Sequence, residues 1–200
     1  MKNSRENILK TAFRLFLQKS YKEVTMSEIV NESGLSKGAF YHYFESKEQL
    51  FVEVVKTFYF QKMIVDYSKL NNNSLYEFYH QYVEHVIKKI REIKEYLNYN
   101  DTVLNINYIT IMFDALKLFP EFHNDIKAAQ QKELDAWIEA ISIARNKKEF
   151  SSPMTDLQIA MVFIYSQDGI GLHLLLEGRL ADVQNEMLTL WDHFYKELIS

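Results

Sequence analysis

A glycine between two short amphipathic segments, within residues 25–47, constrains the fold of this chain more than any other feature. The stretch reads TMSEIVNESGLSKGAFYHYFESK. Thr25 is a favourable N-cap, and Glu28 three residues later completes the capping-box pattern. Gly34 stands where the first helix must end, because glycine adopts the left-handed conformation at little cost. Ser36 can then cap a second helix, so the pattern predicts a helix-turn-helix unit.

The second helix of this unit is expected from about residue 37 to residue 44, and its two faces differ. Phe40 and Phe44 are four residues apart, so they share one face and should anchor the helix in a core. The small residues Gly38 and Ala39 would let another surface approach the backbone closely. Tyrosine and histidine side chains beside them can donate hydrogen bonds to phosphates or bases. The alternative is a solvated, aromatic-rich helix of an ordinary α-helical domain.

The segment closely resembles the N-terminal DNA-binding domain of TetR-family transcriptional regulators. The resemblance rests on Thr25, Ile29, the run from Gly34 to Phe44, and Lys47 with Leu50, and it covers about the first quarter of the chain in detail. It implies an all-α fold of about nine helices. An N-terminal three-helix helix-turn-helix domain over residues 1–47 would be joined by a long helix to a C-terminal helical domain for ligand binding and dimerisation over residues 48–200.

The resemblance also implies which residues meet DNA. In the family, the lysine matching Lys47 begins the fourth helix and holds a phosphate. The family often has threonine where Ala39 stands, so one hydroxyl contact is missing here. The candidate DNA-binding residues are Thr25, Ser27, Ser36, Lys37, Gly38, Ala39, Tyr41, His42, Tyr43 and Lys47.

The charge distribution agrees with a DNA-facing N-terminus. The chain of 200 residues has a net charge of −4, yet residues 1–50 hold eight Lys and Arg against six Glu. Acidic residues outnumber basic ones in the rest of the chain. Because the local field governs binding, this asymmetry favours an N-terminal DNA-binding part on an acidic body, although the excess is small.

Composition and the absence of catalytic motifs exclude several classes of protein. There is no cysteine, so disulfides and thiolate metal sites are excluded. No glycine-rich phosphate loop, G-x-S-x-G or H-E-x-x-H motif occurs. We therefore expect no enzyme activity, no cofactor and no metal. The N-terminus lacks a secretory segment, and apolar runs such as residues 160–165 are too short to span a bilayer, which predicts a cytoplasmic protein without a membrane partner.

Few glycines and prolines interrupt the rest of the chain, so long helices are expected. A helix should run from Ser46 to about Tyr67, and another should follow the loop of three asparagines at residues 71–73 and end near Leu97. Four more are expected over residues 102–118, 121–146, 155–177 and 181–199.

The middle helices are rich in aromatic residues and methionine, which line ligand cavities as well as cores. The family resemblance favours an effector pocket, although packing in an ordinary core explains each single residue as well. Few charges interrupt residues 103–113, so we expect an apolar or weakly polar effector. The candidate ligand-binding residues are Phe58, Met63, Tyr82, Tyr108, Met112, Phe113 and Trp137.

The last two helices carry more apolar residues than one buried face requires, which predicts an association surface. Glycines at positions 169 and 171 would let a partner helix come close. In the family, these two helices pair with their symmetry mates in a homodimer. The candidate interface residues are Phe163, Gly169, Leu172, Leu176, Leu190 and Phe194.

These patterns lead to one hypothesis and two alternatives. The hypothesis is a ligand-responsive transcriptional repressor that binds a palindromic operator in double-stranded DNA as a homodimer and is released by a small, largely apolar effector. One alternative is an all-α small-molecule-binding protein or enzyme that retains a DNA-binding-like head. The other is a helix-turn-helix protein controlled by a partner protein.

Overall fold

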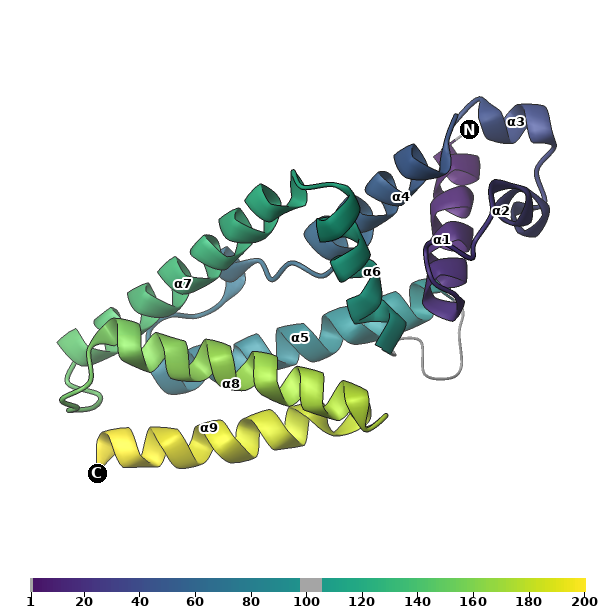
Figure 1. Cartoon of the computed structure of the whole chain (residues 1–200). Helices are drawn as coiled ribbons and strands as arrows, with labels where there is room; N and C mark the ends of the chain where they lie inside the picture. Colours follow the sequence, from purple (N-terminus) through teal and green to yellow (C-terminus); the bar gives the residue numbers. More distant parts are fainter. Residues whose placement is uncertain (1, 98–105) are drawn as a thin grey trace. The chain divides into compact units, whose positions relative to one another are not determined.

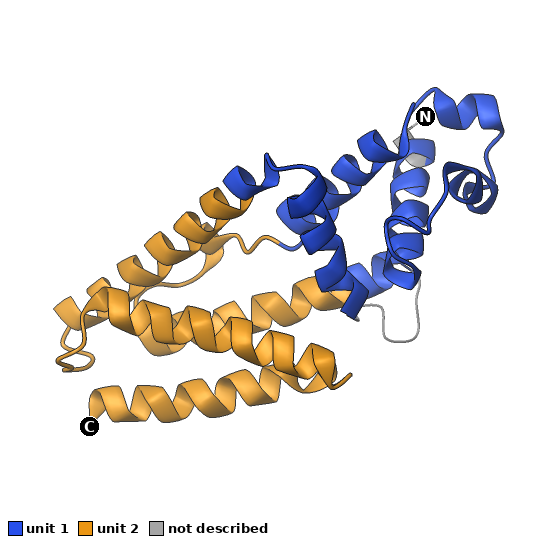
Figure 2. Ribbon diagram, in the orientation of Figure 1, with its two compact units in different colours: residues 1–63, 92–125 blue, residues 64–91, 126–200 orange. Residues whose placement is uncertain are grey.

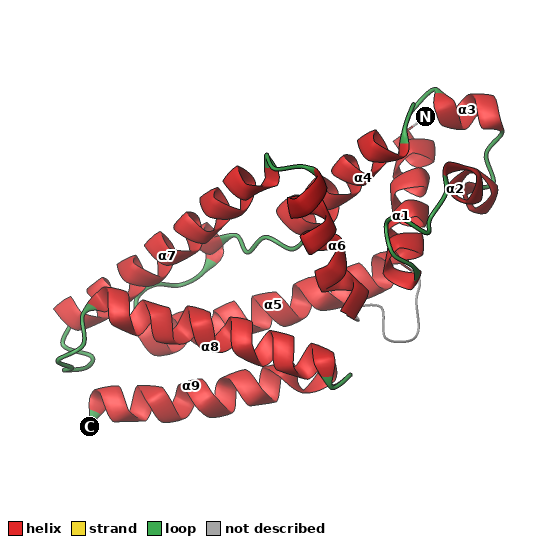
Figure 3. Ribbon diagram, in the orientation of Figure 1, coloured by secondary structure: helices red, strands yellow, loops and turns green. Residues whose placement is uncertain are grey.

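The computed structural model describes residues 2–97 and 106–200, and all regular secondary structure in these ranges is helical (Figure 3). The chain divides into two compact units (Figure 2). Unit 1 comprises residues 1–63 and 92–125, and unit 2 comprises residues 64–91 and 126–200. The predicted all-α class is confirmed, with nine α-helices in the described residues. The domain boundary expected after residue 47 does not coincide with a border between the units. The assignment of DNA binding to residues 1–47, and of ligand binding and dimerisation to residues 48–200, stays a prediction.

Unit 1 contains the predicted helix-turn-helix. Its elements are α1 (Lys2–Gln18), α2 (Met26–Ser33), α3 (Lys37–Tyr41), α4 (Lys47–Val55), the π-helical turn η1 (Lys56–Lys62), the last residues of α5 (Leu75–Leu97), α6 (Ile106–Leu118) and the first residues of α7 (Phe122–Asn146) (Figure 1). The expected start of α6 at residue 102 lies outside the described residues.

The core of unit 1 is built on the apolar face of α1. Phe13 and Phe16 are completely buried. The ring of Phe13 stacks on Phe58 of η1 with centroids 4.0 Å apart, and Phe16 meets Phe51 of α4 edge-on at 5.2 Å. Because large aromatic side chains bury much surface and prefer such geometries, these contacts fix α4 and η1 against α1.

The helix that begins at Lys47 is shorter than the sequence predicted. It continues from α4 into η1 and ends at Lys62, rather than near Tyr67. Within this π-helical turn, the buried ring of Tyr59 stacks on Tyr108 of α6 at 4.5 Å, and its hydroxyl donates a hydrogen bond to the Tyr108 backbone oxygen. A wider helical turn re-aims side chains, which periodicity in a sequence does not reveal.

Unit 2 is formed by long helices. Its elements are the 3-10 turn η2 (Tyr67–Lys69), most of α5, most of α7, α8 (Asp156–Leu176), the 3-10 turn η3 (Leu180–Asp182) and α9 (Val183–Ile199). The predicted helices agree with α5, α7 and α8 to within one or two residues at the predicted ends. The last helix begins at Val183, two residues later than expected, because η3 precedes it.

An aromatic cluster holds these helices together. Trp137 of α7 stacks on Phe163 of α8 at 4.7 Å, and Trp191 of α9 meets Phe163 edge-on at 5.1 Å. The indole N–H of Trp191 donates to the Ser166 hydroxyl at 2.9 Å, so this nitrogen is satisfied inside the core. On α5, the Tyr79 hydroxyl donates to Asp192 Oδ1 at 2.7 Å.

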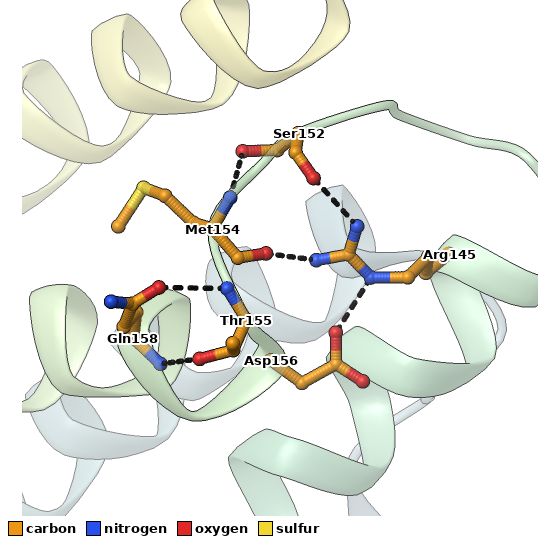
Figure 4. Close-up of polar contacts among 6 residues, drawn as sticks. All are labelled: Arg145, Ser152, Met154, Thr155, Asp156 and Gln158. Carbon is orange, nitrogen blue, oxygen red and sulfur yellow. Dashed lines mark hydrogen bonds and ion pairs between the residues drawn. The ribbon is translucent and has the colours of Figure 1, made fainter.

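A single arginine organises the segment between α7 and α8 (Figure 4). The guanidinium of Arg145 donates to Asp156 Oδ1 at 2.7 Å and to the backbone oxygens of Ser152 at 3.0 Å and Met154 at 2.7 Å. Thr155 then starts α8 with a complete capping box, in which Gln158 is the reciprocal partner. Only the rigid fork of arginine can satisfy three acceptors placed in this way.

We expect Arg145→Lys to destabilise the chain, because lysine keeps the charge but cannot reach all three acceptors. The loss should be about 1–2 kcal/mol, which corresponds to a melting temperature about 2–8 °C lower for a protein of this size. Thermal unfolding followed by circular dichroism measures it. The matched control is Arg179→Lys, since Arg179 pairs only with carboxylates at the surface and such pairs contribute little. Equal losses in both variants would contradict the assigned role.

Candidate functional site

Local hydrogen bonds build the turn between α2 and α3. The Thr25 hydroxyl accepts a hydrogen bond from the Glu28 N–H at 3.2 Å, as expected of an N-cap. The reciprocal half of the capping box is absent, because the Glu28 carboxylate binds Lys19 Nζ instead. Gly34 adopts the left-handed conformation with φ 68° and ψ 12°, and the Ser36 hydroxyl accepts from the Ala39 N–H at 3.3 Å. The predicted helix-turn-helix is therefore confirmed at its caps.

Two buried phenylalanines and two side chains of α1 fix the orientation of α3. Phe40 and Phe44 are 0% and 1% exposed. The Arg5 guanidinium lies 5.5 Å from the centre of the Phe44 ring, and Asn7 Nδ2 donates to the Ser33 backbone oxygen at 2.8 Å. A helix of five residues is not stable by itself, so these contacts determine which of its faces is exposed.

The exposed face of α3 is the one that the sequence predicted. Ser36, Lys37, Gly38, Ala39 and His42 are exposed. Tyr41 is exposed as well, and Tyr43 is half-buried, with its ring centre 5.2 Å from that of His42. Thr25 and Ser27, at the start of α2, are exposed too. The candidate DNA-binding residues of α2 and α3 thus lie at or near the surface, and the two anchoring phenylalanines do not.

Gly38 is not required by the fold of the chain. Its φ is not in the left-handed region, and a Cβ atom built on it would meet no other atom within 4 Å. Glycine in a helix destabilises it by about 0.5–1 kcal/mol relative to alanine. No contact within the chain therefore explains why this exposed helix contains glycine instead of alanine. The absence of a side chain leaves the backbone of α3 open to close approach by another molecule.

Lys47 has a structural role that the sequence did not reveal. Its ammonium group donates to the backbone oxygens of Tyr21 and Val24, both at 2.9 Å, and lies 4.3 Å from the centre of the Tyr21 ring. The Tyr21 hydroxyl in turn donates to Glu48 at 3.1 Å. Burial, and then the Glu48 carboxylate, raises the pKa of Tyr21 to about 12. Lys47 therefore joins the start of α4 to the segment before α2, and it keeps one of its three N–H donors for an external acceptor.

Unit 2 contains a cavity of about 350 Å³ between α7 and α8. Two acidic side chains from different helices, Glu133 and Asp168, contribute to its wall together with apolar residues. The Tyr82 hydroxyl, from α5, donates to Glu133 Oε1 at 3.1 Å. Sequence reasoning missed both acids, because they stand on helices whose polar residues looked solvated.

The candidate ligand-binding residues fall in both units. Phe58, Met63, Tyr108, Met112 and Phe113 belong to unit 1. Phe58 is fully buried against Phe13, whereas Phe113 is 65% exposed. Tyr82 and Trp137 belong to unit 2, where their ring centres lie 5.3 Å apart and both rings are buried. The structure brings these last two together, and the Tyr82 hydroxyl donates to Glu133 of the cavity wall, but neither ring lines the cavity.

The candidate interface residues lie on α8 and α9. Leu172, Leu176 and Leu190 are 46%, 63% and 47% exposed. Gly169 shares the α8 face of the two leucines, and a Cβ built on it would meet nothing within 4 Å. Phe194 is half-buried, and Phe163 is completely buried in the core of its own unit, so Phe163 has no surface left for a partner.

By length and composition alone, α8 is apolar enough to cross a membrane, with a mean hydropathy of 1.5 over its most apolar window. The uninterrupted apolar runs of the sequence do not indicate this. Its buried residues pack into the aromatic cluster of unit 2, while a minority of the window, 28%, is buried. The apolar remainder of α8 is surface that a partner can cover.

Within the described residues, no cluster of three or more His, Asp or Glu side chains has the arrangement of a metal site.

Comparisons with known proteins identify relatives of the N-terminal segment. Residues 8–54 match the family model described as bacterial regulatory proteins, tetR family. An uncharacterized HTH-type transcriptional regulator of Bacillus subtilis, YerO, is 50% identical over 50 residues, which are 25% of this chain and 17% of that protein. The matches to the first two such relatives span about a fifth of their length.

Longer matches also exist. The transposon Tn10 TetC protein of Escherichia coli is 28% identical over 171 residues, covering 75% of this chain and 84% of that protein. The crystal structure of a TetR/AcrR-family transcriptional regulator superposes with a TM-score of 0.68 at 20% identity, covering 98% of this chain and 100% of the other. This last likeness shows that the fold is shared.

We expect Lys47→Met to lower the free energy of unfolding by about 1–3 kcal/mol, because two partly buried carbonyl oxygens lose their donor. Methionine keeps the apolar stem of the side chain. Lys37→Met is the matched control, since Lys37 is exposed at the start of α3, and it should change stability by less than about 0.5 kcal/mol. Urea denaturation measures both, and a Lys47 variant as stable as the control would contradict the structural role.

Proposed function

Because the chain belongs to the TetR family of bacterial regulatory proteins, we propose that it is a ligand-responsive transcriptional repressor that acts in the cytoplasm. Regulators of this family are DNA-binding proteins and not enzymes. We propose further that this chain binds a palindromic operator as a homodimer and that a small, largely apolar effector releases it.

The observation that carries the proposal is the exposed face of α3. The helix is anchored from behind by Phe40 and Phe44, and its outer face presents Gly38 with open space around the Cβ position. A major groove admits an α-helix, and a helix without side-chain bulk at this point can approach the base edges closely. Close approach to DNA would then explain why glycine stands at position 38, although the fold does not require it.

The side chains around Gly38 divide into two roles in this proposal. Lys37 lies in the first turn of α3, the end that recognition helices direct towards the bases. Tyr41, His42 and Tyr43 can donate to phosphates or bases, and Ala39 can contact a thymine methyl group. We propose that phosphates are contacted by Thr25, Ser27, Ser36 and the third N–H donor of Lys47. Since no arginine stands on α3, bidentate reading of guanine by arginine is absent there, and DNA shape carries more of the specificity.

We expect Gly38→Ala to weaken DNA binding at least tenfold and to leave the melting temperature unchanged or higher. The methyl group would separate α3 from the groove floor, whereas helices themselves favour alanine over glycine. Fluorescence anisotropy with fragments from upstream of the gene measures binding, and thermal unfolding measures stability. Full DNA affinity in a folded Gly38→Ala protein would remove the main support for the proposal.

The homodimer is proposed on the exposed apolar stripe of α8 and α9. Gly169, Leu172 and Leu176 recur at the spacing of one helix face, and Leu190 and Phe194 stand four residues apart on α9. A glycine with free space around its Cβ position allows a helix of the second copy to come near. Two copies are also required by the function, because dimers that carry one recognition helix each read two half-sites of a palindrome.

We expect Leu172→Glu combined with Leu190→Glu to convert a dimer into a monomer and to abolish operator binding, because charges at the centre of an apolar interface remain unpaired. Leu157→Glu is the matched control, since Leu157 is 42% exposed in the first turn of α8, roughly 20 Å along the helix axis from Leu172. Sedimentation velocity gives the oligomeric state. A wild-type protein that sediments as a monomer at micromolar concentration would exclude this interface.

Release by an effector requires a conformational equilibrium. The effector must bind the state that does not bind DNA more tightly, and about 1–3 kcal/mol of coupling suffices. In unit 1, α4 and η1 form one uninterrupted helical segment from Lys47 to Lys62, and its Phe58 is stacked on α1. A displacement of Phe58 is therefore passed to the helices that hold α3. The other candidate pocket residues of unit 1 are Met63, Tyr108, Met112 and Phe113, and those of unit 2 are Tyr82 and Trp137.

A further inference from the structure

The wall of the cavity between α7 and α8 combines acidic and apolar side chains with Lys127, Gln130 and Gln131. Glu133 comes from α7 and Asp168 from α8. The apolar part of the wall is formed by Leu134, Met161, Ile164 and the ring of Tyr165. At about 350 Å³ the cavity is at the lower end of the range for small-molecule sites.

Glu133 is held in place by tyrosines. The hydroxyls of Tyr82 and Tyr67 both hydrogen-bond its carboxylate, and the Tyr67 and Tyr82 rings are stacked with centres 6.1 Å apart. Burial raises the pKa of the Glu133 carboxyl above its ordinary value despite these hydrogen bonds. Burial raises the pKa of the Asp168 carboxyl as well.

No positive charge inside the described part of unit 2 compensates these two acids. Lys127 contributes to the same wall, but its side chain is exposed and makes no ion pair with either carboxylate among the described contacts. The Asp168 carboxylate also disfavours ionisation of Glu133, because like charges repel. Asp168 is the more exposed of the two acids. A carboxylate removed from water is stable as an ion only when it is paired or hydrogen-bonded, so a cation in the cavity would stabilise both charges.

We propose that this cavity binds an organic cation with an apolar body, and that Glu133 and Asp168 neutralise its charge. This inference rests on the proposed function, because it names the chemical class of the effector. The apolar residues would contact the body of the guest. The ring of Tyr165, at the exposed edge of the wall, could contact the cationic group by a cation–π interaction, and the flexible Met161 could adapt to the shape of the guest.

The wall favours an organic cation over a metal ion. In the described residues, no group of three or more His, Asp or Glu side chains could hold a metal ion, and Leu134, Met161 and Ile164 offer no oxygen ligand to a hard cation. Lys127 need not repel a bound cation. Its side chain is exposed at the rim of the cavity, and a lysine can extend its ammonium group into solvent while its apolar stem stays in place.

The test uses the full chain, the quaternary cation benzyltrimethylammonium, and its neutral carbon isostere neopentylbenzene, which has the same shape without the charge. Isothermal titration calorimetry should show the cation binding at least tenfold more tightly than the isostere. Glu133→Gln and Asp168→Asn should each weaken binding of the cation by about tenfold, as expected for a lost charge-assisted contact.

The matched control is Glu139→Gln, an exposed carboxylate on α7 outside the cavity, which should leave the affinity unchanged. Burial makes the charged forms of Glu133 and Asp168 less stable than they are in water. Their amide variants should therefore unfold at the same temperature as the wild type or higher. Loss of binding then cannot be attributed to loss of the fold.

The proposal is overturned if the isostere binds as tightly as the cation, or if Glu133→Gln keeps the wild-type affinity. It is also overturned if benzyltrimethylammonium, tetraethylammonium and benzamidine all fail to bind at millimolar concentration. DNA binding is measured separately. A cation that binds the cavity without releasing DNA would support the cation site and contradict the proposal that an effector in this cavity releases DNA. If only a neutral compound released DNA, effector-driven release would be supported and the cation site would be contradicted.

Discussion

The packing of α1 against α4 and η1 is the interaction on which the DNA-facing part of the molecule depends. Phe13 and Phe16 join these helices through rings that are fully buried. On another part of α1, Arg5 and Asn7 hold Phe44 and the end of α2. A helix as short as α3 does not form alone, so its existence and its orientation both derive from α1.

Charged side chains in this chain mainly stabilise backbone and neighbouring helices. Lys47 satisfies two carbonyl oxygens before α2, and Arg145 satisfies two more before α8. Arg5, Arg14 and Lys19 are paired with glutamates of unit 1. The small positive excess of residues 1–50 therefore overstates the charge available to DNA. In the proposed function, DNA affinity depends more on close approach, backbone N–H groups and polar side chains, which agrees with an α3 that contains Gly38 and Tyr41 and is followed by His42 and Tyr43.

The parts of the structure that were predictable from the sequence depend on local interactions. Thr25, Ser36 and Gly34 act within two or three residues along the chain, so their types and spacing revealed the helix-turn-helix and its exposed face. The helices of the body followed from periodicity, apart from a few residues at their ends. The predicted reciprocal hydrogen bond between the Glu28 carboxylate and Thr25 was wrong, because Lys19, just after the end of α1, binds that carboxylate.

The unpredicted features all result from contacts between residues far apart in the sequence. Lys47 was expected to serve DNA alone, and its two carbonyl partners precede it by more than twenty residues. Phe163 was assigned to an association surface, since an apolar helix does not show which of its faces its own chain covers. Glu133 and Asp168 belong to one cavity because α7 and α8 pack together, and no spacing within either helix indicates this.

A cavity with unpaired acids provides the property that an effector site needs. A ligand shifts an equilibrium only by the difference in its affinity for the two states. The free energy of a carboxylate depends steeply on its solvation, so a small change in the packing of α7 on α8 changes the affinity for a cation strongly. The same change alters an apolar contact only in proportion to its area. Two acids on different helices are therefore a more sensitive means of coupling than the aromatic residues around them, which mainly supply binding energy common to both states.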